Sequence, residues 1–234
     1  MFSRLILEAT VYTDKQLVVP QTLQWALVGR SNVGKSSLLN CLAGVQKLAH
    51  TSSTPGKTRS LNFYRVAEKT LYLVDLPGYG YAAISKKEHE HWAKLVNRYL
   101  TSTRTLAGVV LLLDSRLPPQ ALDLELARFI QAYAINLLPV LTKSDKCNQR
   151  ERNSRQKEWA ALLSPYPTPL PFSSKTGLGR DTLWHQLFTK TTPESVFGIN
   201  NTYFDSFAAT GAGHISSLTN DKLPLKQESP PEDT

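Results

Sequence analysis

Residues 25–36 read Trp25-Ala26-Leu27-Val28-Gly29-Arg30-Ser31-Asn32-Val33-Gly34-Lys35-Ser36. A glycine, four residues and Gly-Lys-Ser follow an apolar run that predicts a strand, and the next residues predict a helix. Glycines let the backbone turn so that successive N–H groups point inward, and the positive end of the helix adds to their attraction for an anion. This pattern predicts a phosphate-binding loop rather than a glycine-rich turn with a surface lysine.

Three side chains near this loop suit a nucleotide bound with Mg2+. Lys35 would place its charge on the β- and γ-phosphates, and the Ser36 hydroxyl would ligate a Mg2+ ion that bridges them. The run 71–74 predicts a strand that ends in Asp75-Leu76-Pro77-Gly78. An acidic residue at the C-terminal end of a strand suits metal binding. We therefore expect Asp75 to act on Mg2+ through a water, and the Gly78 N–H to meet the γ-phosphate.

Predicted strands and helices alternate along the chain, which indicates an α/β fold. Residues 61–66 and 71–74 predict an antiparallel hairpin. Further strands are expected at 109–113, 137–141 and 169–172, and helices at about 85–101, 118–135, 151–163 and 180–190. We expect a mostly parallel six-stranded sheet with one antiparallel edge hairpin and helices on both faces. An N-terminal arm or lead-in strand over 1–21 would lie against the edge of this single domain, 22–190.

Charge is distributed unevenly over the 234 residues. The formal net charge is +8, but residues 191–234 contain two lysines against six acidic residues, so residues 1–190 carry +12. A basic domain favours a polyanionic partner such as nucleic acid. The last 44 or so residues are rich in polar residues and proline, and cannot bury enough apolar surface to repay ordering. We expect a disordered acidic tail over 191–234.

Other features favour a cytoplasmic protein without a membrane segment. Glu8 interrupts the run Leu5-Ile6-Leu7, so no signal-peptide core is expected. The two cysteines give no disulfide framework and suit a reducing compartment. His89 and His91 are candidate metal ligands. Residues two apart on a helix point to different faces, however, so a solvated helix face is favoured over a metal site.

The motifs together resemble those of a Ras-like GTPase, and their amino-acid sequences are similar to those of the EngB family, also called YihA or YsxC. The likeness covers about Trp25 to Lys190 and rests on three runs: residues 29–37, Thr54-Pro55-Gly56-Lys57-Thr58 with Asn62-Phe63-Tyr64, and Asp75-Leu76-Pro77-Gly78-Tyr79-Gly80-Tyr81-Ala82. The resemblance implies a Ras-like P-loop GTPase domain that binds GTP and GDP.

The fourth motif, Thr142-Lys143-Ser144-Asp145, favours guanine. The Asp145 carboxylate can accept from the ring N–H and the exocyclic amine of guanine, and adenine presents no such pair of donors. A P-loop ATPase or kinase is therefore disfavoured. Thr142 stands where many GTPases have Asn, a familiar variant in this family. The resemblance implies that the Lys143 stem packs along the base and that the backbone of Ser174 and Lys175 meets the guanine oxygen.

The full nucleotide site that the resemblance implies includes five segments. They are Gly29, Arg30, Ser31, Asn32, Val33, Gly34, Lys35, Ser36 and Ser37; Gly56, Lys57, Thr58, Arg59 and Ser60; Asp75, Leu76, Pro77 and Gly78; Thr142, Lys143, Ser144 and Asp145; and Ser173, Ser174 and Lys175. Mg2+ would be held by Ser36, Thr58 and, through water, Asp75. Thr58 is favoured as the switch ligand that binds while the γ-phosphate is present; Thr54 is the competing choice.

Catalysis is expected to depart from Ras-type enzymes. Tyr79 stands where those enzymes carry the glutamine that orients the attacking water, so intrinsic hydrolysis should be slow. The catalytic candidates are Lys35, Thr58, Gly78 and Asn32. By resemblance to the wider TrmE–Era group, Asn32 is a candidate ligand for a K+ ion that replaces an arginine finger.

The resemblance implies a switch that helps to assemble the large ribosomal subunit, with rRNA or the subunit as its partner. Normal cell division and septation would need this switch only indirectly. The alternative is a GTP-dependent scaffold acting directly in division. We expect a monomer in either case.

Overall fold

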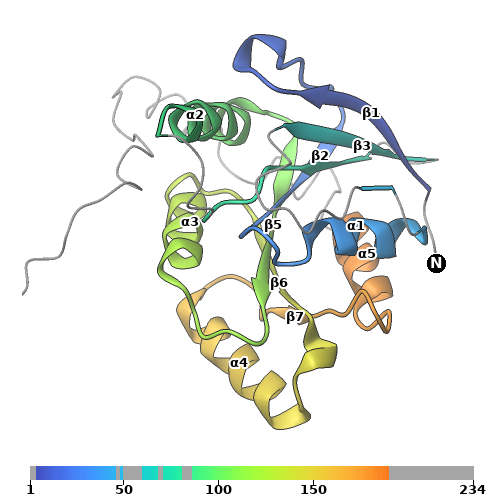
Figure 1. The fold of residues 1–234 in the computed structure, drawn as a ribbon, viewed down its shortest axis with the longest axis vertical. Coiled ribbons are helices and arrows are strands. Elements are labelled where there is room, and N and C mark those ends of the chain that lie inside the picture. Colours follow the sequence, from blue (N-terminus) through green and yellow to red (C-terminus); the bar gives the residue numbers. More distant parts are fainter. Residues whose placement is uncertain (1–3, 46–47, 50–59, 68–70, 81–85, 190–234) are drawn as a thin grey trace, which may run out of the picture.

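The computed structural model describes residues 4–45, 48–49, 60–67, 71–80 and 86–189, with only the backbone over 86–92. A seven-stranded sheet lies at the centre, in the order β1-β3-β4-β2-β5-β6-β7 (Figure 1). Strands β2, β4, β5, β6 and β7 are parallel, whereas β3 runs antiparallel to both β1 and β4. The strands are β1 (Leu5–Val11), β2 (Leu23–Gly29), β3 (Leu61–Val66), β4 (Leu71–Asp75), β5 (Leu106–Asp114), β6 (Leu137–Thr142) and β7 (Leu170–Pro171).

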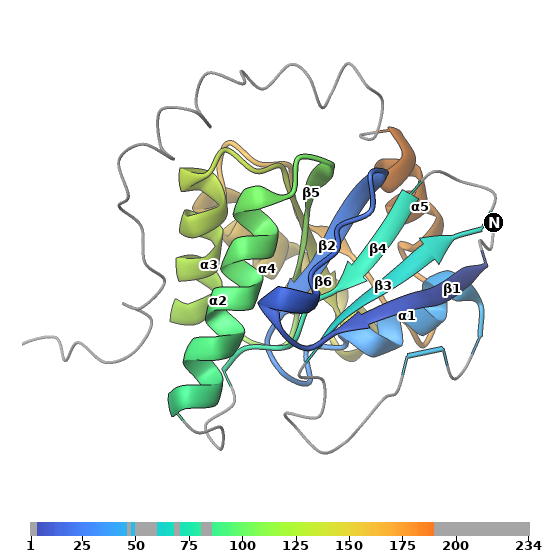
Figure 2. The same cartoon turned by 90° about the horizontal axis from the view of Figure 1, so that it is seen from above.

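In the described part of the chain, five α-helices cover the two faces of the sheet (Figures 1 and 2). Helices α1 and α5 pack in one apolar cluster, and α2, α3 and α4 pack in the other. The helices are α1 (Lys35–Ala43), α2 (Lys86–Ser102), α3 (Ala121–Ala132), α4 (Gln149–Leu162) and α5 (Arg180–Thr189). None of the described helices is long and apolar enough to cross a membrane.

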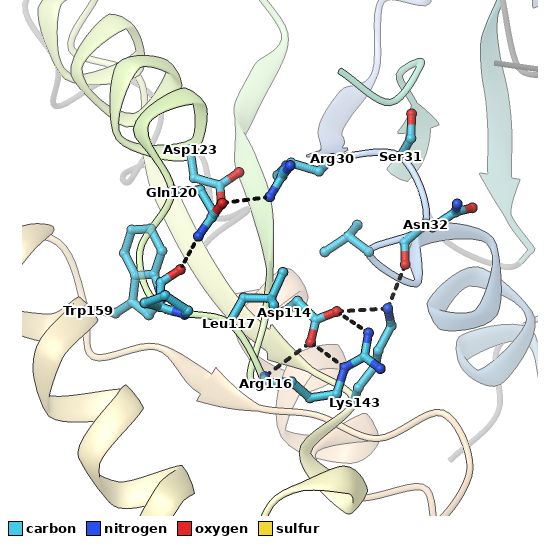
Figure 3. A pocket seen from close by; sticks show the side chains of 12 residues that line it. Arg30, Ser31, Asn32, Asp114, Arg116, Leu117, Gln120, Asp123, Lys143 and Trp159 are labelled. Carbon is cyan, nitrogen blue, oxygen red and sulfur yellow. Dashed lines mark hydrogen bonds and ion pairs between the residues drawn. The ribbon is translucent and has the colours of Figure 1, made fainter. Parts of the chain in front are cut away.

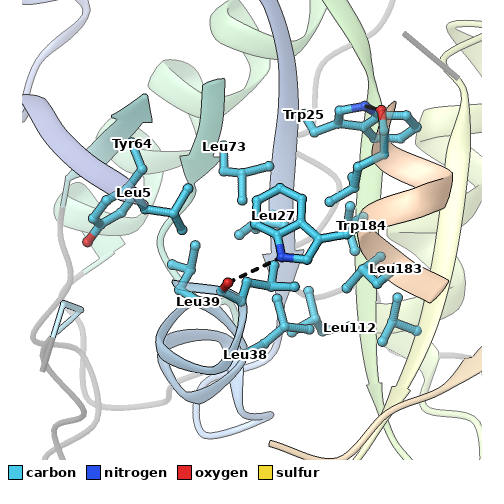
Figure 4. Packing of buried hydrophobic residues seen from close by; sticks show 14 of the residues in the cluster. Leu5, Trp25, Leu27, Leu38, Leu39, Tyr64, Leu73, Leu112, Leu183 and Trp184 are labelled. Carbon is cyan, nitrogen blue, oxygen red and sulfur yellow. Dashed lines mark hydrogen bonds between the residues drawn. The ribbon is translucent and has the colours of Figure 1, made fainter. Parts of the chain in front are cut away.

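Strand β2 is central because its side chains feed both clusters. Successive residues of a strand point to opposite faces, so Trp25 and Leu27 join the α1/α5 side while Ala26 and Val28 join the other. On the α1/α5 side, the Trp184 indole N–H donates to the Leu42 carbonyl at 3.2 Å, which joins α5 to α1 (Figure 4). This packing fixes the direction in which α1 leaves the sheet.

The predicted α/β fold with helices on both faces is confirmed, and the sheet has one strand more than predicted. Residues 5–11, which lie within the segment expected as an arm or a lead-in strand, form β1 and pair antiparallel with β3. The β3–β4 hairpin is present, but β1 takes the edge of the sheet. The extra strand is stabilised because Leu5 and Val11 are buried, one in each apolar cluster. Residues 7–10 of β1 are all exposed, so buried and exposed positions do not alternate along this strand.

Candidate functional site

The predicted phosphate-binding loop connects the end of β2 to the start of α1. Gly34 precedes the helix with a φ of 114°, a left-handed conformation that favours glycine. It offers no side-chain cap, so the N–H groups of the first helical turn remain available to an anion. At Gly29 an added Cβ would lie 2.8 Å from a methyl group of Val33 and 2.9 Å from the Leu112 carbonyl. Both glycines are therefore required by the geometry of the loop.

Lys35 and Asp75 form a buried ion pair at the start of α1. Their side chains are 8% and 2% exposed, and the Lys35 ammonium donates to Asp75 Oδ1. The pair forms because β2 and β4 are parallel neighbours, with Leu27 opposite Asp75 in the register. The structure thus brings together two residues that are 40 positions apart and that the sequence assigned to one site.

The segment after β4 lies against the phosphate-binding loop. The Tyr79 N–H donates to the Gly29 carbonyl at 3.3 Å, and the Ser31 N–H donates to the Tyr79 carbonyl at 2.9 Å. A Cβ on Gly78 would lie 3.0 Å from the Ser31 nitrogen, closer than the two backbones allow without moving apart. Gly78 therefore lets Asp75-Leu76-Pro77-Gly78, the third motif of the site, approach the loop.

Thr142 links the fourth motif to the same loop. It is 3% exposed, and its hydroxyl oxygen lies 2.7 Å from the Val33 carbonyl and 3.0 Å from the Leu113 carbonyl. The hydroxyl carries a single proton, so it donates to one of these carbonyls at a time. The Asn that many GTPases carry at this position would also supply a hydrogen-bond donor. Thr142 supplies one from a shorter side chain.

Lys143 makes a second link to the loop, through its charge. Its ammonium donates to the Asn32 carbonyl at 2.6 Å and to Asp114 Oδ2 at 2.8 Å (Figure 3). Lys143 and Asn32 both have positive φ values, 57° and 62°, which non-glycine residues adopt only where the surroundings impose them. The two facing turns are therefore held in defined conformations.

Asp145 is held by Ser173, the first residue of the fifth motif, Ser173-Ser174-Lys175. The Ser173 hydroxyl donates to Asp145 Oδ1 at 2.7 Å, and this hydrogen bond lowers the pKa of the Asp145 carboxyl. Ser173 is fully buried, and β7 beside β6 places it at the same edge of the sheet. An ionised carboxylate is an acceptor only, which is the form that suits the two donors of guanine.

A pocket of about 200 Å3 borders the loop on the side of α3 and α4 (Figure 3). Arg30 crosses its edge and donates to Gln120 at 3.1 Å. The Tyr79 hydroxyl donates to Asp123 of α3 at 2.7 Å. Burial raises the pKa of both Tyr79 and Asp123. The Tyr79 hydroxyl is thus directed at α3.

Part of the predicted site lies outside the described residues. This part comprises Thr54, Gly56, Lys57, Thr58, Arg59, Tyr81 and Ala82, together with the side chains of His89 and His91 and the tail 191–234. Ser60 is described and buried, and its hydroxyl lies 3.3 Å from Asn62 Oδ1. Ser36, Ser37, Ser174 and Lys175 lie at the same strand-end edge as the other predicted residues: Ser36 and Ser37 in the first turn of α1, and Ser174 and Lys175 directly after Ser173.

Sequence reasoning missed Asp114, Arg116 and Asp123. Asp114 ends β5, the strand beside β2, and so follows the same strand-end rule that singled out Asp75. Applying that rule to every predicted strand would have found Asp114, whereas Arg116, a basic residue beyond the strand end, is identified only by its contact with Asp114. Asp123 lies inside α3, where no periodic or spacing signal distinguishes it.

The residues that are described fit a Mg2+ ion that is shared with phosphates. The Asp75 carboxylate and the Ser36 hydroxyl are hard oxygen donors near the first turn of α1, and Mg2+ prefers such donors. No group of three or more His, Cys, Asp or Glu side chains suited to a metal occurs in the described part of the chain. One or two protein oxygens supplemented by phosphate oxygens and waters is the usual arrangement for Mg2+ in nucleotide enzymes.

The phosphate-binding loop, the third motif beside it and the guanine-type fourth motif at one sheet edge define a Ras-like P-loop GTPase. A family model described as a 50S ribosome-binding GTPase matches residues 24–143. The chain is 56% identical over 197 residues to a probable GTP-binding protein EngB of Oleidesulfovibrio alaskensis, covering 84% of this chain and 90% of that protein. It is 58% identical over 183 residues to the EngB of Desulfovibrio desulfuricans, covering 78% and 90%. The chain belongs to the EngB family of GTP-binding proteins.

Solved structures agree on the fold. A crystal structure of a probable GTP-binding protein EngB superposes with a TM-score of 0.60 at 22% identity, covering 72% of this chain and 98% of that one. An Aquifex aeolicus Era variant bound to GDP and aluminium fluoride gives a TM-score of 0.61 at 23% identity, covering 73% and 57%.

Proposed function

We propose that this protein binds GTP and GDP at the carboxyl edge of its sheet, hydrolyses GTP slowly, and acts as a Mg2+-dependent switch in assembly of the large ribosomal subunit. One observation carries the nucleotide part of the proposal. Two successive carbonyls of the phosphate-binding loop, those of Asn32 and Val33, accept from the two successive fourth-motif residues Lys143 and Thr142. A nucleotide spanning both motifs would therefore find its phosphate and base subsites joined in one unit.

The roles follow from the chemistry of each group. The first-turn N–H groups of α1 bind phosphate oxygens, and Lys35 exchanges its contact with Asp75 for the β- and γ-phosphates. Asp145 selects guanine, and Ser173 orients the Asp145 carboxylate. The Gly78 N–H meets the γ-phosphate, and Ser174 and Lys175 offer backbone groups to the guanine oxygen.

Ser36 and Thr58 of the switch, and Asp75 through a water, would hold Mg2+, which would neutralise charge on the β- and γ-phosphates. The switch depends on Thr58: it contacts the site only while the γ-phosphate is present, and release of that phosphate frees the segment around it.

Slow hydrolysis is supported by the placement of Tyr79. Its hydroxyl donates to Asp123 of α3, so the residue at the usual glutamine position is engaged elsewhere. Asn32 is the proposed ligand for a K+ ion that assists hydrolysis. GTP turnover should be faster in K+ buffer than in Na+ buffer, alone or with ribosomal subunits present. Equal turnover in both buffers under both conditions would refute the role of K+.

Two observations support the ribosomal role. The matching family model is described as a 50S ribosome-binding GTPase, and residues 1–190 carry a net charge of +12, which favours contact with RNA phosphates. Any requirement in cell division and septation would then be an indirect result of failed ribosome assembly, and we place the protein in the cytoplasm as a monomer.

The test is co-sedimentation of GTP-loaded and GDP-loaded protein with isolated large ribosomal subunits. The GTP form should bind, the GDP form should bind less, and added salt should weaken both complexes because phosphate contacts release counterions. Recruitment to the division septum without any ribosome association would contradict the proposal and favour the direct scaffold.

A further inference from the structure

Asp114 lies at the end of β5 and faces the fourth motif across the sheet edge. It is paired in the register with Thr142, the residue before Lys143. Its side chain is 8% exposed, and its Oδ2 accepts from the Lys143 ammonium at 2.8 Å. Asp114 is not among the residues that the sequence assigned to the nucleotide, whereas its partner Lys143 is.

Arg116 covers the other side of the same carboxylate. Its Nε donates to Asp114 Oδ1 at 2.9 Å, its Nη2 donates to Oδ2 at 2.8 Å, and its backbone N–H donates to Oδ1 at 3.1 Å. Such a two-pronged arginine contact fixes the plane of a carboxylate. Asp114 therefore presents a fixed, ionised oxygen to Lys143.

Lys143 is restrained between two acceptors. Its ammonium reaches the Asn32 carbonyl at 2.6 Å and the Asp114 carboxylate at 2.8 Å. A lysine side chain loses substantial rotamer freedom when it is held in one geometry. Because Asp114 holds it in advance, less of that entropy is left to lose when a base packs along the lysine stem.

We propose that Asp114 is a positioning residue for guanine nucleotide binding, which acts through Lys143 and is itself oriented by Arg116. The inference rests on the proposed function, because it assigns the stem of Lys143 to the base. In this role Asp114 acts without contacting the nucleotide itself. Its contribution is to hold Lys143 against the phosphate-binding loop before the nucleotide arrives.

The test measures the affinity of fluorescent N-methylanthraniloyl-GDP for the full chain and for three variants. Asp114→Asn removes the negative charge of the acceptor and should weaken binding about tenfold, the low end of the effect of a hydrogen bond to a charged group, because Asn32 still accepts from Lys143. Lys143→Met should also weaken it. In the Lys143→Met background, Asp114→Asn should change the affinity less than about twofold, since the residue through which it acts is gone. The matched control is Asp14→Asn, which removes an ion pair with Arg98 on α2 and should leave the affinity unchanged.

A merely structural role for Asp114 would give a different pattern. In steady-state GTP hydrolysis, Asp114→Asn should raise KM and leave kcat unaltered, whereas general loosening of the fold would lower kcat as well. An unchanged affinity, or an equal loss in the presence and absence of Lys143, overturns the proposal. If Asp114→Asn does not fold, Arg116→Gln replaces it, with an expected loss of about threefold that disappears in the Lys143→Met background. Wild-type protein that fails to bind the labelled GDP overturns the proposed function instead.

Discussion

Replacing Thr142 by valine removes one hydroxyl at the joint between the phosphate-binding loop and the fourth motif. Valine keeps the branched shape of threonine, so the change isolates the hydrogen bond. The lost donor lies 2.7 Å from the Val33 carbonyl, at a residue that is 3% exposed. Leaving a buried acceptor without its donor costs about 1–3 kcal/mol. We expect Thr142→Val to lower the free energy of unfolding of the nucleotide-free protein by about 1–2 kcal/mol. GDP binding should also weaken, by up to about tenfold, because GDP binding must then hold the loop and the fourth motif together without this bond, and each 1.4 kcal/mol of that cost is about tenfold in affinity.

The assay combines urea unfolding of the nucleotide-free protein with equilibrium titration of labelled GDP. Thr142→Ser keeps the hydroxyl and should retain most of the affinity. Thr101→Val is the matched control, because the Thr101 hydroxyl donates at 2.8 Å to the carbonyl of Asn97 within α2, away from the sheet edge. Wild-type affinity and stability in Thr142→Val would refute the reasoning that this hydroxyl ties the loop to the fourth motif.

Three further predictions concern stability. Tyr79→Phe leaves Asp123 buried without its donor and should lower the free energy of unfolding in urea by about 1–2 kcal/mol; an unchanged value would show that the contact contributes nothing. Gly78→Ala places a Cβ 3.0 Å from the Ser31 nitrogen and should lower the melting temperature by about 2–4 °C for each 1 kcal/mol of strain; an unchanged melting temperature would mean that the two segments part freely. Burial raises the pKa of Asp114, but hydrogen bonds from Arg116 and Lys143 outweigh burial and lower the pKa to about 2. A carboxyl whose pKa is depressed on folding contributes stability above its unfolded value, near 3.8, so this contribution should disappear between pH 4 and pH 2. Over that pH window the free energy of unfolding should fall more steeply in the wild type than in Asp114→Asn. Equal slopes in the two proteins would contradict this role of the Asp114 carboxylate.

The sequence was sufficient for the parts of the site that depend on local pattern. The spacing of Gly29, Gly34 and Lys35 predicts a turn and a helix start that the structure contains. Asp75 was predicted because parallel strands end at one edge of a sheet, and its contact with Lys35 follows directly from the β2–β4 register. Local rules succeed here because they act on adjacent residues or adjacent strands.

The parts that the sequence left open depend on contacts between distant segments. The link from Thr142 to the Val33 carbonyl spans 109 positions and involves a backbone atom, which carries no residue-type signal. The edge strand β1 has exposed residues over 7–10, so its pairing with β3 is what decides between a strand and an arm. The role of Asp123 as the acceptor for the Tyr79 hydroxyl follows only from the position of Tyr79 against α3.

The most direct measurement of the central claim is a competition of guanine, adenine and xanthine triphosphates for wild-type protein and for Asp145→Asn. The wild type should prefer GTP over ATP and over xanthosine triphosphate, because the ionised Asp145 held by Ser173 accepts from both guanine donors. The variant should lose its preference for GTP and admit xanthosine triphosphate. Guanine selectivity retained in Asp145→Asn would contradict the assignment of the base site.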